Sequence, residues 1–174
     1  MKLALSDYVR TIPDFPKEGI QFKDITPLLQ HPGAVKQAAD ALAALARAAG
    51  VHKVVAVEAR GFWLGPLIAD RLSVGWVPVR KAGKLPAPTH AVSYDLEYGT
   101  DQLFMHRDAI APGEAVLVHD DLLATGGTAR AACQLVEAGG GRVVQVSFLV
   151  ELAFLSGRNR LKPYSVRSLL SYDK

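Results

Sequence analysis

The residues best suited to bind a phosphate ester lie in one short segment, 116–128, with the sequence VLVHDDLLATGGT. An apolar run leads into the adjacent acids Asp120 and Asp121 and then into a turn rich in glycine and threonine. Glycines let backbone N–H groups approach an anion closely, and a following helix adds partial positive charge at its N-terminus. The segment therefore predicts a phosphate cradle formed by Ala124, Thr125, Gly126, Gly127 and Thr128.

The spacing of this segment also limits what it can bind. It lacks the lysine of a Walker A loop and the glycine spacing of a dinucleotide fold, so a monophosphate ester is expected. Paired carboxylates accept hydrogen bonds from a vicinal diol, and Asp120 and Asp121 are therefore expected to face the hydroxyls of a ribose 5-phosphate. The alternative interpretation is a simple helix cap after a strand. His119 is expected to pack beneath the loop without a catalytic role.

Alternating strands and helices must position these residues. Apolar β-branched runs predict strands at 53–57, 76–79, 115–119 and 143–150, and helical spacing predicts helices at 62–72, at 128–138 and from Pro32 to Gly50. Such alternation predicts an α/β fold with a mostly parallel central sheet and helices on both faces. The order of elements thus predicts that polar loops gather at the carboxyl edge of the sheet.

Two stretches depart from this alternation. Segments 91–96 and 103–107 are predicted to form a hairpin with its turn at 97–100, long enough to act as a lid. Residues 1–32 hold four prolines and are interpreted as an irregular N-terminal extension. The chain is expected to be a single domain, 1–174, that includes this extension and a flexible lid at about 80–107.

Composition excludes several classes of protein. The chain has 174 residues, 49% of them apolar, with a formal net charge of +3. This mild excess suits a small anionic ligand, and no nucleic-acid partner is expected. No signal peptide or membrane helix is expected either, so a cytoplasmic location is predicted. The single cysteine, Cys133, is interpreted as a buried helix residue.

The segment 120–128, DDLLATGGT, resembles the phosphoribosyl diphosphate (PRPP) loop of type I phosphoribosyltransferases, in particular of adenine phosphoribosyltransferases. Four further segments occur in the order that this family shows: DFPKEGIQFKDITP (14–27), EARGF (58–62), VRKAGKLP (79–86) and SYDLEYG (93–99). The resemblance covers nearly the whole chain. It implies the type I phosphoribosyltransferase fold and a transferase that makes AMP and pyrophosphate from adenine and PRPP in purine salvage.

The resemblance implies roles for the remaining polar residues. It assigns pyrophosphate to Glu58, Ala59 and Arg60 and to the basic residues Arg80, Lys81 and Lys84, for which a solvated basic face is the alternative. Arg60, Glu97 and Tyr98 would act at the reacting centre, with Glu97 as a base for the purine N9 proton. An N-terminal hood would hold the base with Gln21, Phe22, Lys23 and Leu122, although a simple core role is the alternative for Phe22.

The family resemblance further implies Mg²⁺ held mainly by the diphosphate, ribose oxygens and water, with no direct protein ligand named. It also implies a homodimer in which lid bases reach the neighbouring site. His119, Ala59 and Lys23 depart from the usual pattern, which has an aliphatic residue, serine and arginine at these positions. The alternatives are a phosphoribosyltransferase for another base and a regulatory protein that senses PRPP.

Overall fold

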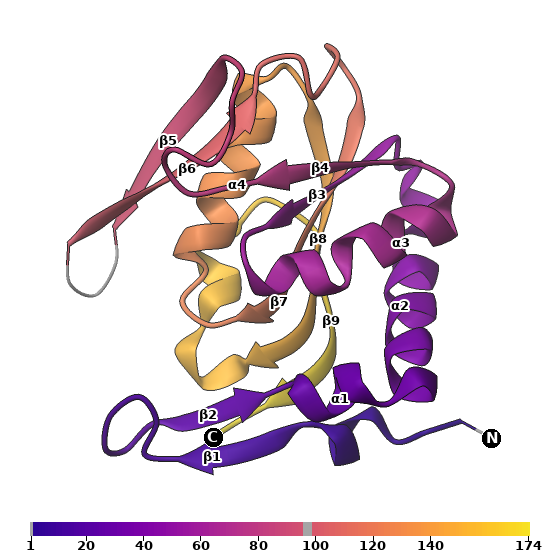
Figure 1. Ribbon diagram of the computed structural model, residues 1–174, viewed down its shortest axis with the longest axis vertical. Helices are drawn as coiled ribbons and strands as arrows, with labels where there is room; N and C mark the ends of the chain where they lie inside the picture. Colours follow the sequence, from indigo (N-terminus) through magenta and orange to yellow (C-terminus); the bar gives the residue numbers. More distant parts are fainter. Residues whose placement is uncertain (1, 96–98) are drawn as a thin grey trace.

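Five parallel strands form the central sheet of the computed structural model, which describes residues 2–95 and 99–174 (Figure 1). Their order is β4-β3-β7-β8-β9, and every neighbouring pair is parallel. The strands are β3 (Lys53–Val57), β4 (Gly75–Val79), β7 (Ala115–Leu123), β8 (Arg142–Leu152) and β9 (Val166–Tyr172). The predicted parallel sheet is confirmed, although the prediction did not include β9.

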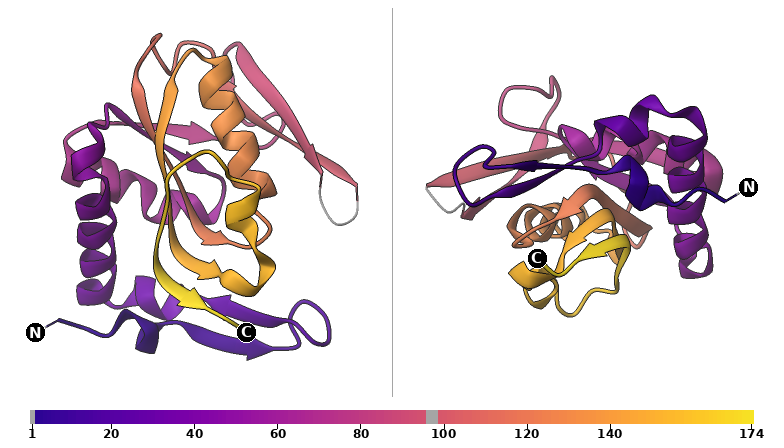
Figure 2. Two further views of the ribbon diagram at one scale, coloured as in Figure 1. Left: turned by 180° about the vertical axis from the view of Figure 1, so that it is seen from behind. Right: turned by 90° about the horizontal axis from the view of Figure 1, so that it is seen from below.

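Helices cover both faces of this sheet, as predicted (Figures 1 and 2). On one face α2 (Pro32–Ala46) and α3 (Gly65–Leu72) pack against inward side chains such as Val54 and Leu117. On the other face α4 (Gly127–Ala138) packs against Val55 and Val118. These two apolar layers bury the middle of the sheet and leave its carboxyl edge for polar loops.

Helix boundaries follow local chemistry. The side chain of His31 caps α2, its Nδ1 accepting from the Ala34 N–H at 3.1 Å, and Gly50 ends the following 3₁₀ turn η2 (Arg47–Ala49) with a φ of 62°. The predicted helix 62–72 begins instead as the 3₁₀ turn η3 (Arg60–Trp63), before α3. Cys133 is buried in α4, and burial raises the pKa of its thiol to about 12.

The prediction that residues 1–32 are irregular is wrong. This segment contains the 3₁₀ turn η1 (Leu5–Tyr8), the antiparallel strands β1 (Arg10–Pro13) and β2 (Gln21–Asp24), and the short helix α1 (Thr26–Gln30). Asp24 joins them, because its carboxylate accepts from the Thr26 N–H at 2.9 Å and from Arg10 Nη2 at 2.5 Å. Burial opposes ionisation, but these bonds and the Thr26 hydroxyl lower the pKa of Asp24 to about 2.

The predicted hairpin is confirmed as β5 (Thr89–Asp95) paired with β6 (Thr100–His106). Leu103 and Met105 of β6 are buried in the same layer as α4, and Arg80 pairs with Phe104 beside the end of β4. The hairpin is therefore anchored at its base. Part of the predicted turn, residues 97 and 98, lies outside the described residues.

Two short 3₁₀ turns, η4 (Ala153–Leu155) and η5 (Gly157–Asn159), connect β8 to β9. Within residues 2–95 and 99–174, none of the helices has the length and apolar character needed to span a membrane.

Candidate active site

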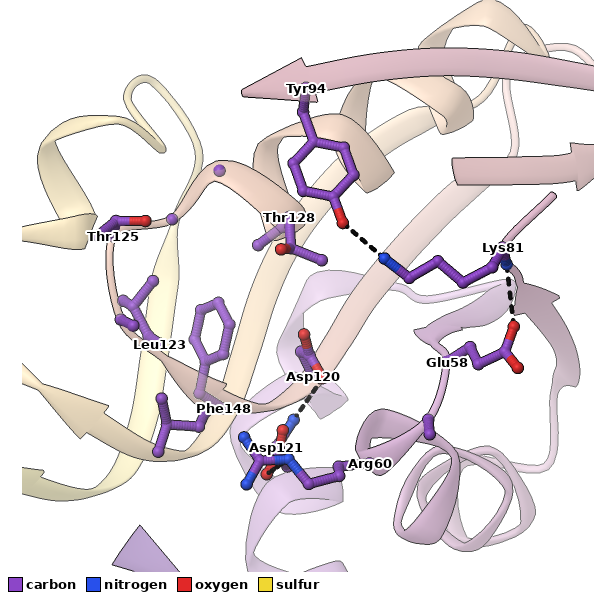
Figure 3. Close-up of a pocket in the computed structure, with 16 residues that line it drawn as sticks. Glu58, Arg60, Lys81, Tyr94, Asp120, Asp121, Leu123, Thr125, Thr128 and Phe148 are labelled. Carbon is purple, nitrogen blue, oxygen red and sulfur yellow. Dashed lines mark hydrogen bonds and ion pairs between the residues drawn. The ribbon is translucent and has the colours of Figure 1, made fainter. Parts of the chain in front are cut away.

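A cavity of about 300 Å³ opens at the carboxyl edge of the sheet, between the loops that follow β3 and β7 (Figure 3). This edge is where open α/β sheets bind their ligands. The lining brings together residues predicted from distant segments: Glu58, Ala59, Arg60, Lys81, Asp120, Asp121, Leu122, Ala124, Thr125, Gly126, Gly127 and Thr128. Tyr94, Leu123, Ala129 and Phe148 complete it.

The proposed phosphate cradle lies between β7 and α4. Strand β7 continues beyond the predicted boundary at residue 119, through both acids to Leu123, so the acids belong to a sheet strand. Gly126, the N-cap residue before α4, has a φ of 82°, a left-handed conformation that favours glycine. Thr125 and Thr128, which carry hydroxyls, line the same cavity (Figure 3). Gly127, Thr128 and Ala129 of the first turn of α4 also line it, and the first turn of a helix leaves N–H groups without an intrahelical partner.

The two acids are held close to each other and to Arg60. The Asp121 N–H donates to Asp120 Oδ1 at 2.9 Å, and Arg60 Nε lies 3.1 Å from Asp121 Oδ2. That ion pair is not aligned as a hydrogen bond, so this buried oxygen has no hydrogen-bond donor among the described residues. A ligand hydroxyl could supply the missing donor.

Burial dominates the electrostatics of the acids. It raises the pKa of Asp120, and the neighbouring charge of Asp121 raises it further. Burial also raises the pKa of Asp121, while Arg60 acts in the opposite direction. Two carboxylates side by side in a cleft therefore favour a ligand that brings hydrogen-bond donors or positive charge.

The loop after β3 carries Glu58, Ala59 and Arg60. Glu58 accepts from Arg80 Nη2 at 3.1 Å and from the Lys81 N–H at 2.9 Å, and these bonds lower the pKa of its carboxyl. The arginine side chain is thereby turned toward Glu58. Among the described residues the cavity lining includes Lys81 but neither Arg80 nor Lys84, and Lys84 is exposed.

Lys81 is the basic side chain that reaches the cavity from the segment 79–86. Its Nζ donates to the Tyr94 hydroxyl at 2.9 Å (Figure 3). It also contacts the Asp101 carboxylate, and both partners are on the hairpin. Burial opposes its protonation, but these two partners raise the pKa of Lys81 above its usual value. Tyr94, which also lines the cavity, was not among the site residues predicted from the sequence. Pairing within the hairpin places it opposite Asp101 of β6.

A second, more apolar cavity of about 300 Å³ adjoins the first, and Arg60 lines both. Phe22 of β2 lies in its wall, with the guanidinium carbon of Arg60 5.3 Å from the centre of the Phe22 ring. The other lining residues are Ile12, Phe15, Asp24, Ile25, Thr26 and Trp63. This cavity is suited to a flat apolar group with few polar atoms.

The other proposed base residues are arranged differently. Gln21 is exposed, and Leu122 lines the first cavity. Lys23 points away from Phe22, as neighbours on a strand do, and its Nζ lies 3.0 Å from Thr11 Oγ1 and 4.2 Å from the centre of the Tyr172 ring. The side chain of Lys23 thus joins β2 to the end of β9. Glu97 and Tyr98 lie outside the described residues.

Comparison with known proteins identifies the family. The model of the phosphoribosyl transferase domain matches residues 24–169. The adenine phosphoribosyltransferase of Roseiflexus sp. is 55% identical over 172 residues, covering 99% of this chain and all of the relative.

Solved structures agree with the sequence comparison. The crystal structure of adenine phosphoribosyltransferase from Thermoanaerobacter pseudethanolicus has a TM-score of 0.94 and 49% identity, covering 97% of this chain and 98% of the other. The APRTase from Giardia lamblia complexed with 9-deazaadenine has a TM-score of 0.92 and 35% identity, covering 99% and 100%. The chain therefore belongs to the phosphoribosyl transferase domain family and, within it, to the adenine phosphoribosyltransferases.

Proposed function

We propose that this protein transfers the 5-phosphoribosyl group of PRPP to N9 of adenine, giving AMP and pyrophosphate. One observation supports this most directly: a polar cavity with a phosphate cradle and paired acids shares Arg60 with an apolar, aromatic cavity. The two compartments match the two halves of the product, a ribose phosphate and a flat base. The names of the relatives at 55% and 49% identity support the same activity.

The polar cavity would hold the ribose 5-phosphate. The phosphate would receive backbone N–H groups at the start of α4 and the hydroxyls of Thr125 and Thr128. Asp120 and Asp121 would accept from the ribose 2- and 3-hydroxyls, one of which would supply the donor that the buried Asp121 Oδ2 lacks among the described residues. Binding thereby favours the ionised form of both acids.

The basic residues would hold the diphosphate on the opposite side of the ribose. Ala59 and Arg60 follow β3, with Glu58 fixing Arg80, and Lys81 reaches over from the end of β4. In the transfer the C1–O bond to pyrophosphate breaks and the C1–N9 bond forms, so positive charge develops at C1. The carboxylates would stabilise that charge while the cations stabilise the departing pyrophosphate.

The apolar cavity would hold the base. Adenine would lie where the two cavities adjoin, between the Phe22 ring of the apolar cavity and Leu122 of the polar one. By the family resemblance, main-chain groups of Gln21 and Lys23 would bind its 6-amino group and N1. The proton lost from N9 would pass to Glu97, with Tyr98 beside it. This role rests on the family resemblance of the segment 93–99.

The donor set also fits a Mg²⁺ ion. Asp120 and Asp121 present hard oxygen donors beside the cradle, and no group of three metal-ligating side chains is found among the described residues. The ion would neutralise part of the diphosphate charge and take its ligands mainly from substrate oxygens and water.

The proposal extends to assembly and location. We propose a homodimer in which the partner subunit helps to close the site, and exposed apolar side chains such as Leu45 and Trp63 offer surface for a second copy. A monomer by light scattering would contradict it. The proposed compartment is the cytoplasm, which suits a single buried, free cysteine.

The decisive experiment compares bases in one assay. Purified protein with PRPP and Mg²⁺ is given adenine, hypoxanthine, guanine, xanthine or orotate, and kcat/KM is measured for each. Hypoxanthine presents an oxo group and an N–H where adenine presents an amino group and an acceptor. Two mismatched buried contacts cost about 1–3 kcal/mol each, so adenine should be preferred by about a hundredfold or more.

The same assay separates the alternatives. Comparable turnover of hypoxanthine would contradict the adenine assignment and support a transferase for another base. Binding of PRPP without turnover of any base would support a sensing protein. Gln21→Ala should keep the preference for adenine, because the proposed readers are main-chain groups and the Gln21 side chain is exposed.

A further inference from the structure

The segment that follows β8 packs directly behind the phosphate cradle. A Cβ on Gly157 would lie 2.2 Å from the Ala124 carbonyl oxygen, and a Cβ on Gly126 would lie 2.7 Å from the Gly157 carbonyl oxygen. The two backbones therefore touch at a place where neither glycine can carry a side chain. Leu161, just beyond η5, is fully buried in the core layer of α4 and fixes the far end of this segment.

An ion pair between the buried Glu151 and the exposed Arg158 holds the near end. Glu151, at the end of β8, is 5% exposed, and Arg158 Nε and Nη2 donate to its two carboxylate oxygens at 2.5 and 2.6 Å. Arg158 also donates to the Val166 carbonyl at 2.9 Å, and the Ser168 hydroxyl donates to Glu151 at 2.5 Å. Arg158 lies next to Gly157, so β8 and β9 jointly fix the backbone that contacts the cradle.

We infer that the Glu151–Arg158–Ser168 network is a positioning device for the binding of the 5-phosphate. None of the three side chains lines the polar cavity among the described residues. Their effect passes through Gly157, which sets how far the loop 124–126 can retreat from a ligand. Because N–H donors must lie within about 0.5 Å of their productive positions, loosening this support weakens phosphate binding specifically.

The chain offers a matched control. Arg71 of α3 makes a smaller set of bonds of the same kind, with Nε 2.5 Å from Asp40 Oδ1 and Nη1 3.1 Å from the Leu67 carbonyl. Arg71→Ala therefore removes an arginine–carboxylate and arginine–carbonyl contact between the helices α2 and α3, which do not line the cradle. A general loss of stability would affect Arg158→Ala and Arg71→Ala alike.

The test measures KM for PRPP, KM for adenine, Tm and the affinity for ribose 5-phosphate by calorimetry. Arg158→Ala should raise the KM for PRPP and the Kd for ribose 5-phosphate by about tenfold or more, with the KM for adenine within about twofold. Ser168→Ala, a milder change, should shift the same quantities in the same direction by a smaller factor. Arg71→Ala should lower Tm without changing either KM.

Two results would overturn the inference. One is an unchanged Kd for ribose 5-phosphate in both Arg158→Ala and Ser168→Ala; the other is an equal rise in both KM values. Ser168→Ala keeps the test decisive if Arg158→Ala does not fold. The inference rests on the proposed phosphate cradle but not on the choice of base, because ribose 5-phosphate binding is measured without turnover. A wild type that binds this ligand but rejects adenine would refute the proposed function alone.

Discussion

Asp120 and Asp121 are adjacent acids at the carboxyl edge of the sheet, where Asp121 is 3% exposed and its charge opposes the ionisation of Asp120. Burial raises the pKa of both carboxyls, and the second charge raises that of Asp120 further. Ionisation of these carboxyls therefore lowers the free energy of unfolding of the free protein. A bound ribose would offset that cost with hydroxyl donors, so the same residues that weaken the free protein favour the complex.

Asp120→Asn should therefore stabilise the free protein and impair binding. A raised folded-state pKa means that the penalty for ionisation is present at high pH, diminishes as the pH falls through that pKa and vanishes below the unfolded value. The variant should exceed the wild type in Tm by about 3 °C or more at pH 8, with a smaller difference at pH 5. Its affinity for ribose 5-phosphate should fall by about tenfold or more.

Thermal unfolding between pH 5 and 8 measures the difference in Tm, and calorimetric titration measures the affinity for ribose 5-phosphate. Asp108→Asn, at an exposed site in the loop after β6, is the control and should change neither quantity. A Tm difference between variant and wild type that grows as the pH falls would contradict the expectation that ionised Asp120 destabilises the free protein. Retained affinity for ribose 5-phosphate would remove Asp120 from the ribose site.

The residues that line the cavity could be predicted from the sequence where they lie together in one short segment. The residues from Asp120 to Thr128 follow one another, so the cavity they line was predictable. Tyr94 was missed because its place depends on pairing with Asp101 across the hairpin. His119 is buried as predicted, with its Nδ1 3.0 Å from Ser147 Oγ, and burial lowers its pKa to about 4. The Ser147 contact depends on the β7–β8 register, which the sequence did not reveal.

At the scale of elements, the hairpin β5–β6 controls one basic side chain of the site. Lys81 extends from the end of β4 to Tyr94 and Asp101, whereas Arg80 turns to Glu58. The family resemblance assigned Arg80, Lys81 and Lys84 together to the pyrophosphate. Only the structure separates them, because their directions depend on how the hairpin packs beside β4.

Lys81→Met should lower kcat/KM for PRPP by about tenfold or more while changing the Kd for AMP by less than about twofold. The reason is that its charge would act on pyrophosphate, which AMP lacks. Steady-state kinetics with calorimetry of AMP binding measures both. Lys84→Met is the comparison: a larger loss there than in Lys81→Met would assign the main role to Lys84. Equal losses in AMP affinity and turnover would contradict a pyrophosphate role for Lys81.

At the scale of the whole molecule, most of the central sheet could be predicted from the sequence, but strand β9 and the N-terminal segment could not. Strands 53–57 and 115–119 are apolar apart from Lys53 and His119 at their ends, as expected of strands buried on both faces. Strand β9 is at the edge of the sheet and mixes Arg167 and Ser168 with leucines, so its pattern was weak. In the N-terminal segment the prolines suggested irregularity, yet Pro13 ends β1 and Pro27 lies in the first turn of α1.

The C-terminal strand β9 meets the N-terminal hairpin β1–β2 beside the proposed base site. Figures 1 and 2 show the C-terminus beside the hairpin β1–β2, and Lys23 connects them through its contact with the Tyr172 ring. Phe22, the neighbour of Lys23 on β2, faces the apolar cavity. The end of the chain therefore supports the wall on which the base would lie.

Tyr172→Leu should accordingly raise the KM for adenine while leaving the KM for PRPP within about twofold. A cation–π contact contributes about 0.5–2 kcal/mol. If all of it acts by positioning Phe22, its loss corresponds to a rise of roughly 2-fold to 30-fold in the KM for adenine. Tyr172→Phe keeps the ring and should restore the wild-type KM. Tyr164→Leu is a comparison variant that removes a second cation–aromatic contact, with Arg130 of α4 at 5.1 Å, together with the hydrogen bond from Tyr164 to Glu137. Arg158→Ala is expected to give the opposite pattern, a rise in the KM for PRPP alone. That same pattern in Tyr172→Leu would refute a role of the C-terminus in base binding.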